Sequence, residues 1–219
     1  MAQVISNLTN AISYINTLLE LDSSPPTSGD EDYTVWMNLL NVAINLWENE
    51  EGVLWKELFA DLTTASDGEK TTVAGQYAYD LPTNFKFLNS GIVWVDDTPF
   101  TVIKIEDLQL YDQNLGNWVY FTQTHMNFNP NLTITGGSTI KYNYYKDATA
   151  LSTGASTFEM SDPMFAVYYA VAELTKEEGN AQALTISTQK LEAMKTKNEM
   201  TAIHQENSIT NPVGDGFGY

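Results

Sequence analysis

The stretch that decides the fold is residues 47–88, WENEEGVLWKELFADLTTASDGEKTTVAGQYAYDLPTNFKFL. Its first part, around Trp47 and Trp55, is aromatic and follows a helical pattern. Its last part, which Tyr79-Asp80-Leu81-Pro82 opens, is typical of β-strands. The stretch therefore predicts a change from helix to sheet, and it contains no catalytic signature.

Two helical segments are predicted at the N-terminal side of this stretch. Apolar residues recur every three or four positions over residues 4–19 and stop before Asp22-Ser23-Ser24-Pro25-Pro26. A second pattern begins at the acidic residues 30–32 and runs to Trp47, with an apolar face so wide that we expect this helix to be packed on two sides. After a break or kink at Gly52, residues 53–62 are predicted to continue the helix.

The central region has the alternation and turn residues of β-strands. Gly136-Gly137 is predicted to join its last two strands as a hairpin. The expected strand-like runs are residues 73–79, 85–87, 92–94, 100–105, 118–122, 132–134 and 139–145.

Helices return after the sheet. Ser161-Asp162-Pro163 offers a helix cap and a first-turn proline, and the helical pattern then continues, with a turn near Gly179, to about Ile203. The predicted class is α+β, in which the N- and C-terminal helices pack as a helical bundle with a central antiparallel β-rich insertion. The expected parts are an N-terminal helical part (1–70), the β-rich insertion (71–150), C-terminal helices packing on the first part (151–206) and a flexible tail (207–219).

Charge and composition exclude several classes of function. The net charge is −18, all ten basic residues are lysines, and arginine is absent, so sequence-specific nucleic-acid binding is not expected. An acidic wall would instead let DNA pass without gripping it. Without cysteine there is neither a disulfide nor a thiolate metal site. We expect no membrane span and no export signal, because long apolar runs and a basic N-terminal region are missing.

Candidate catalytic residues are few. His125 and His204 have no nucleophile motif beside them, and Asp96-Asp97 is better read as a hairpin turn than as a pair of catalytic carboxylates. The acidic residues 48–51 are expected to form a solvated helix end, because they lack the spacing of a calcium loop. We therefore expect no enzymatic activity, no catalytic residue, no cofactor and no bound metal.

Tyrosines suggest where partners bind. The chain has 12 tyrosines, and adjacent tyrosines on a strand point to opposite faces, so that one of a pair is expected at the surface. Tyrosine is also enriched at protein interfaces. The residues that we expect in a contact between subunits are Tyr142, Tyr144, Tyr145, Tyr168 and Tyr169.

The order of these parts over residues 30–205 resembles the portal adaptors, or head-to-tail connectors, of tailed bacteriophages, which include tail accessory and tail tubular A-like proteins. The resemblance rests on five segments taken together rather than on one motif. They are Trp36–Trp47, Trp55-Lys56-Glu57-Leu58, Gly75-Gln76-Tyr77 with Tyr79-Asp80-Leu81-Pro82, Lys141–Tyr145 leading to Ala150-Leu151, and Pro163–Leu174.

The resemblance implies a structural virion protein, made in the host cytoplasm and located at the neck. Copies of it would form a ring, typically a dodecamer, that docks under the portal protein, contacts tail or nozzle proteins and extends the channel for double-stranded DNA. The C-terminal tail, with Phe217 and Tyr219, would dock into the portal. Two other classes stay open, a tail-associated or surface glycan-binding module and a cell-wall hydrolase that uses Asp96 and Asp97.

Overall fold

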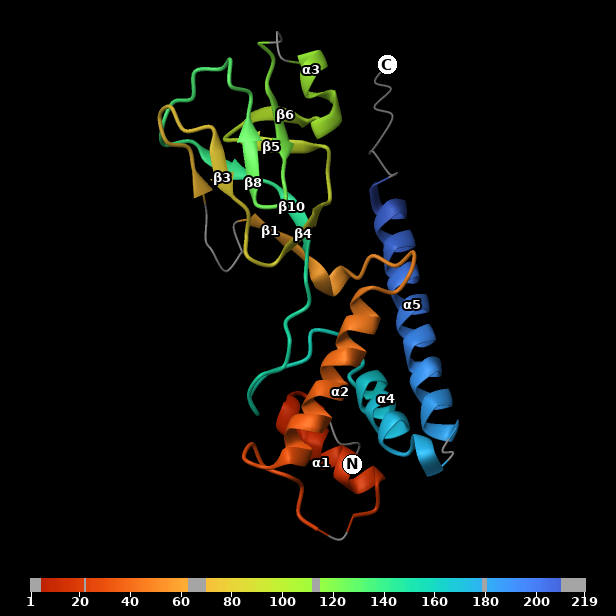
Figure 1. The fold of residues 1–219 in the computed structure, drawn as a ribbon. Helices are drawn as coiled ribbons and strands as arrows, with labels where there is room; N and C mark the ends of the chain where they lie inside the picture. Colours follow the sequence, from red (N-terminus) through yellow and green to blue (C-terminus); the bar gives the residue numbers. More distant parts are fainter. Residues whose placement is uncertain (1–4, 22, 63–69, 112–114, 179–180, 210–219) are drawn as a thin grey trace, which may run out of the picture. The chain divides into compact units, whose positions relative to one another are not determined.

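A computed structural model describes residues 5–21, 23–62, 70–111, 115–178 and 181–209, with only the backbone for residue 178 and for 201–209 (Figure 1). The chain divides into two compact units. A helical unit comprises Met1–Glu57 and Ala148–Tyr219, and a β unit comprises Leu58–Asp147.

The helical unit is organised around one short, apolar helix. Its helices are α1 (Leu8–Leu18), α2 (Glu31–Glu48), α4 (Met164–Leu174) and α5 (Ala181–Ile209), with a 3-10 turn, η4 (Lys176–Glu178), before α5. Helix α4 packs against α1, α2 and α5. Ala166 and Ala170 on α4 are fully buried, and such small side chains let neighbouring helices approach closely. The predicted cap is confirmed, since the Met164 amide donates to Asp162 Oδ1 at 3.1 Å.

The end of α2 reverses the chain. Helix α2 stops at Glu48, and Gly52 has a φ of +74°, a left-handed conformation that favours glycine. The reversal brings two fully buried indoles, Trp47 and Trp55, to a ring-centroid distance of 5.3 Å. The predicted helical continuation over residues 53–62 is therefore wrong: the chain instead forms η1 (Lys56–Leu58) and then enters a strand, β1 (Phe59–Asp61).

The β unit contains two sheets. The larger has seven strands in the order β2-β9-β5-β6-β7-β8-β3, and the smaller has three in the order β1-β10-β4. The remaining strands are β2 (Lys70–Thr71), β3 (Ala78–Asp80), β4 (Phe85–Leu88), β5 (Ile92–Val95), β6 (Thr98–Val102), β7 (Trp118–Phe121), β8 (His125–Phe128), β9 (Thr139–Lys141) and β10 (Asn143–Lys146). A 3-10 turn, η3 (Ile105–Asp107), and a short helix, α3 (Leu108–Tyr111), lie between β6 and β7. Strands β6 and β7 are parallel, and every other pair is antiparallel.

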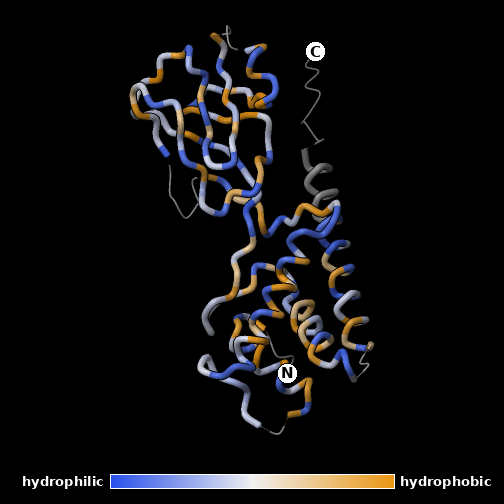
Figure 2. Tube along the Cα trace, in the orientation of Figure 1, coloured by the Kyte–Doolittle hydropathy of each residue, from blue (hydrophilic) through white to orange (hydrophobic). Residues whose placement is uncertain are grey.

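The core of the β unit lies between the buried faces of its strands. It includes Val93, Val119, Ile140 and Tyr144, which are inaccessible to solvent. Burial alternates along β3, β8 and β9, as expected where one face of a strand is buried and the other is not, and Figure 2 shows hydrophobic and hydrophilic residues mixed throughout this unit. The chain changes sheets at Tyr142, which separates β9 in the larger sheet from β10 in the smaller one.

The predicted fold class is wrong. The N- and C-terminal helices do not form a bundle: in the described residues they converge on α4, and contacts of α5 with α1 or α2 are sparse. The central region is not an antiparallel insertion either, because it is a β-rich unit with a curled, mixed seven-stranded sheet and a second, smaller sheet. The predicted hairpin at Gly136-Gly137 is also absent from the described residues, since 132–134 form no strand and β9 pairs with β2 and β5.

Candidate interaction surfaces

A line of apolar side chains lies exposed on α2. Val35, Val42 and Leu46 are 42%, 45% and 45% exposed, and Leu39 between them is half-buried. Their spacings of four, three and four residues place them in one row along the helix, the arrangement by which helices pack against a partner. We call these four residues the α2 stripe.

The α2 stripe is one of two apolar faces of the same helix. The other face, which packs into the helical unit, consists of Tyr33, Trp36, Leu40, Ala43, Ile44 and Trp47. The sequence predicts a helix packed on two sides, and in the structure one of those sides is buried and the other is exposed. A water-facing row of valines and leucines on an ordered helix is typical of a protein contact.

The middle of α2 carries no charge of its own. Residues 33–47 contain no charged side chain, and the exposed neighbours Thr34, Asn38 and Asn45 are polar. Carboxylates stand at the start of the helix, where Glu31 and Asp32 are exposed. In a chain of net charge −18, the middle of the stripe is thus a place where another protein can approach without meeting a carboxylate of α2.

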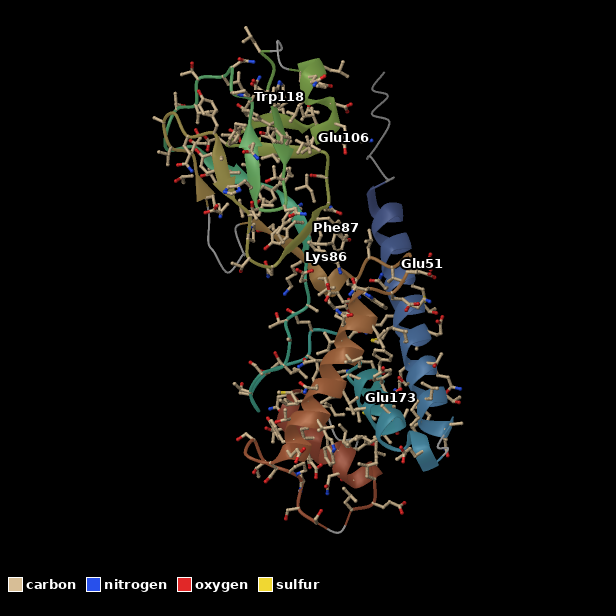
Figure 3. All side chains as sticks on the ribbon, in the orientation of Figure 1. Glu51, Lys86, Phe87, Glu106, Trp118 and Glu173 are labelled. Atoms are coloured by element: carbon tan, nitrogen blue, oxygen red, sulfur yellow. The ribbon has the colours of Figure 1, made fainter. Side chains whose placement is uncertain are left out.

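The β unit exposes a row of three aromatic rings on its three-stranded sheet. Phe59 on β1 lies opposite Tyr145 on β10, which in turn lies opposite Phe87 on β4. The Phe59 and Tyr145 ring centroids are 5.8 Å apart, and those of Tyr145 and Phe87 are 5.1 Å apart. Phe59 and Phe87 are 43% and 38% exposed, and Tyr145 is half-buried between them, so that burial raises its pKa. We call these three residues the aromatic row; Phe87 is labelled in Figure 3.

A register shift places the row on the outer face. Tyr144 and Tyr145 point to opposite faces, and Tyr144 is buried with Phe85 stacked on it at 5.5 Å. Phe85 and Phe87 would share a face of a regular strand. The shift between Tyr145 and Lys146 in the β10–β4 pairing instead lets Phe85 face the core and Phe87 pair with Tyr145 outside.

The predicted interface tyrosines lie in different surroundings. Tyr142 and Tyr144 are buried in the core of the β unit, where the Tyr144 hydroxyl donates to Asn84 Oδ1 at 3.2 Å. Tyr168 and Tyr169 on α4 are half-buried, and burial is the main reason why their pKa values are raised. Phe217 and Tyr219 lie outside the described residues. In this structure the interface prediction therefore depends on Tyr145, Tyr168 and Tyr169, and it stays a prediction.

Two of the candidate carboxylates, Asp96 and Glu50, have structural partners. Asp96, with a φ of +50°, makes the tight turn between β5 and β6, and its Oδ1 accepts from the Thr139 amide at 2.8 Å. This hydrogen bond lowers the pKa of Asp96. The interpretation of Asp96-Asp97 as a hairpin turn is thus confirmed. Glu50 pairs with Lys195 at 2.9 Å, and this contact raises the lysine's pKa.

His125 also has a simple local role. Its Nε2 lies 3.0 Å from Asp80 Oδ1 on the facing strand, and its Nδ1 is 2.7 Å from the Thr124 hydroxyl. Within the described ranges, histidines and acidic residues do not gather into a group that could hold a metal ion. None of the helices described is long and apolar enough to span a membrane. The side chain of His204 lies outside the described atoms.

Sequence reasoning missed Phe59, Phe87 and the exposed half of α2 as surface candidates. Phe59 was expected on a helix, and its position in the row depends on strand pairing with residues far along the chain. For α2 a signal was present, because its apolar residues are too many for one packed face. Composition alone could not separate the face that the chain buries from the one that stays exposed.

Comparison with protein families places the chain in a known family. The model of the SU10 adaptor protein family matches residues 7–214, which is nearly the whole chain and includes both units. No curated protein matches the chain. The chain therefore belongs to the SU10 adaptor protein family, in agreement with the resemblance to phage adaptors that its sequence shows.

Proposed function

We propose that this protein is a structural adaptor of a phage virion, located at the head-to-tail junction. Copies of it assemble as a ring that docks under the portal protein, contacts tail or nozzle proteins and extends the DNA channel. Membership of an adaptor family supports the general role. The observation that carries the assembly step is that α2 has two apolar faces and exposes one of them.

The exposed face is large enough to contribute to assembly. Burying a valine or leucine fully is worth ~1.5–3 kcal/mol, so that covering the remaining exposed part of the stripe would stabilise a contact by roughly 3 kcal/mol per copy. This is too little for a tight complex by itself but enough to support a larger interface. A helix that only stabilised its own chain would gain nothing from keeping Val42 and Leu46 in water.

The charge distribution supports passage of DNA without binding. The helical unit contains eighteen acidic residues and five lysines, and the β unit contains ten and five. A dodecamer would carry roughly two hundred net negative charges, which repel the phosphates of DNA and so keep it from adhering to the channel wall. The absence of arginine removes the side chain most used for gripping phosphates and guanine edges.

Two contacts of the ring follow from the resemblance rather than from the described residues. The C-terminal segment, which includes Phe217 and Tyr219, would dock into the portal. Its aromatic side chains would be the anchors. Tail or nozzle proteins would bind the opposite end of the ring. A structural role of this kind needs no catalytic residue, cofactor or metal.

Negative-stain electron microscopy of the purified chain mixed with its portal protein tests the proposal. We expect rings on the portal in the mixture and monomers in the chain alone, because assembly depends on the portal. Stable rings without the portal would contradict that dependence. A mixture without any ring would contradict the adaptor function. A glycan array that captured the chain would support the alternative of a glycan-binding module.

A further inference from the structure

We propose that the α2 stripe of one copy docks on the aromatic row of the next copy. The inference rests on the proposed ring and adds the two surfaces that make its copy-to-copy contact. It is argued from symmetry, charge and size.

Symmetry requires two different surfaces. A ring is built from head-to-tail contacts, in which a patch on one copy meets another patch on its neighbour. If the α2 stripe met the same stripe of a second copy, the contact would be two-fold and would stop at a dimer. The chain has a second exposed apolar surface in the other unit, the aromatic row of Phe59, Tyr145 and Phe87. When the stripe of one copy contacts the row of a second, the first copy still has a free row and the second a free stripe. Further copies can therefore add in the same way until a ring closes.

Charge favours the same pairing. The stripe begins beside the exposed carboxylates of Glu31 and Asp32, and Glu51 is exposed shortly after the helix ends (Figure 3). Two antiparallel α2 helices would bring the acidic start of one near the acidic end of the other, and two parallel helices would bring their acidic starts together. Either arrangement of α2 on α2 places like charges side by side.

The sheet of the aromatic row is nearly neutral. Its strands carry Lys86, Lys146 and Asp61, and Asp147 follows β10 directly, so that these charges sum to zero in a chain of net charge −18. Lys86 is next to Phe87 on β4, and both are labelled in Figure 3. Lys146 is next to Tyr145 on β10. An acidic helix end therefore meets less repulsion at this sheet than at a second α2.

The two surfaces have compatible sizes. Three strands place the outer rings of the row ~10 Å apart, at a strand spacing of ~4.8 Å. From Val35 to Leu46 the helix rises ~16 Å, at 1.5 Å per residue. The rings therefore cover the middle of the stripe and leave its ends for the flanking polar and charged groups. Aromatic rings against aliphatic side chains are a frequent composition for the centre of an interface.

Cysteine cross-linking tests the contact directly, because the natural chain has no cysteine. Two full-length variants, Val42→Cys and Phe87→Cys, are assembled with the portal protein separately and as an equal mixture, and then treated with a short bismaleimide. We expect cross-linked dimers in the mixture that neither variant forms alone. Using two separate chains excludes cross-links within one chain. In the matched control, Leu184→Cys on α5 replaces Val42→Cys; Leu184 is 51% exposed. This variant should give no cross-linked dimers with Phe87→Cys.

Other outcomes overturn the proposal. Dimers of Val42→Cys alone would show a stripe-to-stripe contact, and dimers of Phe87→Cys alone a row-to-row contact. If electron microscopy shows rings but the mixture gives no specific dimer, the stripe-to-row contact is wrong and the proposed function survives. If the unmodified chain forms no rings with the portal, both proposals fail. If Val42→Cys disturbs assembly, Val35→Cys on the same stripe replaces it, and the same results support or overturn the proposal.

Discussion

Tyr145 stacks on Phe87 on the outer face of β10, with ring centroids 5.1 Å apart. The residue before it in the same strand, Tyr144, is completely buried. The two neighbouring tyrosines therefore have different roles in the same strand. Tyr144 fills the core of the β unit, and Tyr145 is the middle ring of an exposed row. This division separates the effects of mutations on stability from their effects on assembly.

Replacing Tyr144 should mainly lower stability, and replacing Tyr145 should mainly impair assembly. Tyr144→Ala removes a buried ring and is expected to lower the free energy of unfolding by ~3–5 kcal/mol. Tyr145→Ala removes a half-buried ring, so we expect a loss of only ~1 kcal/mol together with impaired assembly on the portal. Urea denaturation followed by tryptophan fluorescence measures the first effect and electron microscopy the second. Equal loss of stability in both variants would contradict the assignment of core and surface.

The two faces of α2 allow a similar comparison. Val42→Glu places a carboxylate on the exposed stripe and is expected to change stability by no more than ~0.5 kcal/mol. Leu40→Glu, two residues earlier on the buried face, should cost at least ~3 kcal/mol, because it removes a core side chain and buries a charge. Circular dichroism during urea unfolding distinguishes the two. Severe unfolding of the Val42 variant would mean that the stripe is covered within the chain.

Asn41 attaches α2 to the chain segment that returns from the β unit. Its amide donates to the Leu151 carbonyl at 3.0 Å and accepts from the Leu151 amide at 2.8 Å. Asn41→Ala should cost ~1–3 kcal/mol, since both backbone groups lose their partner in a partly buried site. Asn45→Ala, at an exposed position of the same helix, is the control and should cost less than ~0.5 kcal/mol. Comparable losses in the two variants would contradict this role of Asn41.

Stability in acid should depend on Asp96. The hydrogen bond from the Thr139 amide lowers the pKa of Asp96 below its usual 3.8, so the folded state binds its proton less readily than the unfolded state. The resulting stabilisation is present above that usual value and is lost as the pH falls through the lowered pKa. Asp96→Asn should therefore show a weaker loss of stability in this range. Asp97→Asn, which removes a charge from the same turn but leaves the Thr139 contact in place, is the control. An unchanged acid profile of Asp96→Asn would contradict the prediction.

Local signals account for the parts that sequence predicts well. The acidic start and the apolar period give α2 nearly to the residue, Asp162 and Pro163 fix the start of α4, and Asp96-Asp97 marks the β5–β6 turn. Each of these features is decided by side chains within a few positions of one another. They therefore leave a readable pattern in a single sequence.

Non-local pairing explains what sequence did not predict. Phe59 lies in a stretch with helical spacing, yet it forms a strand because β10 offers it a partner far along the chain. The segment after Gly136-Gly137 contains both β9 and β10, which belong to different sheets, so its alternation suggested one long strand. The aromatic row unites three strands through their register, and no local pattern encodes a register.

Sedimentation velocity of the chain with its portal protein tests most directly whether the exposed face of α2 drives assembly. The unmodified chain should sediment with the portal as a ring, and Val42→Glu should remain a folded monomer in the same mixture. Ring formation by Val42→Glu to the same extent as by the unmodified chain would contradict the account.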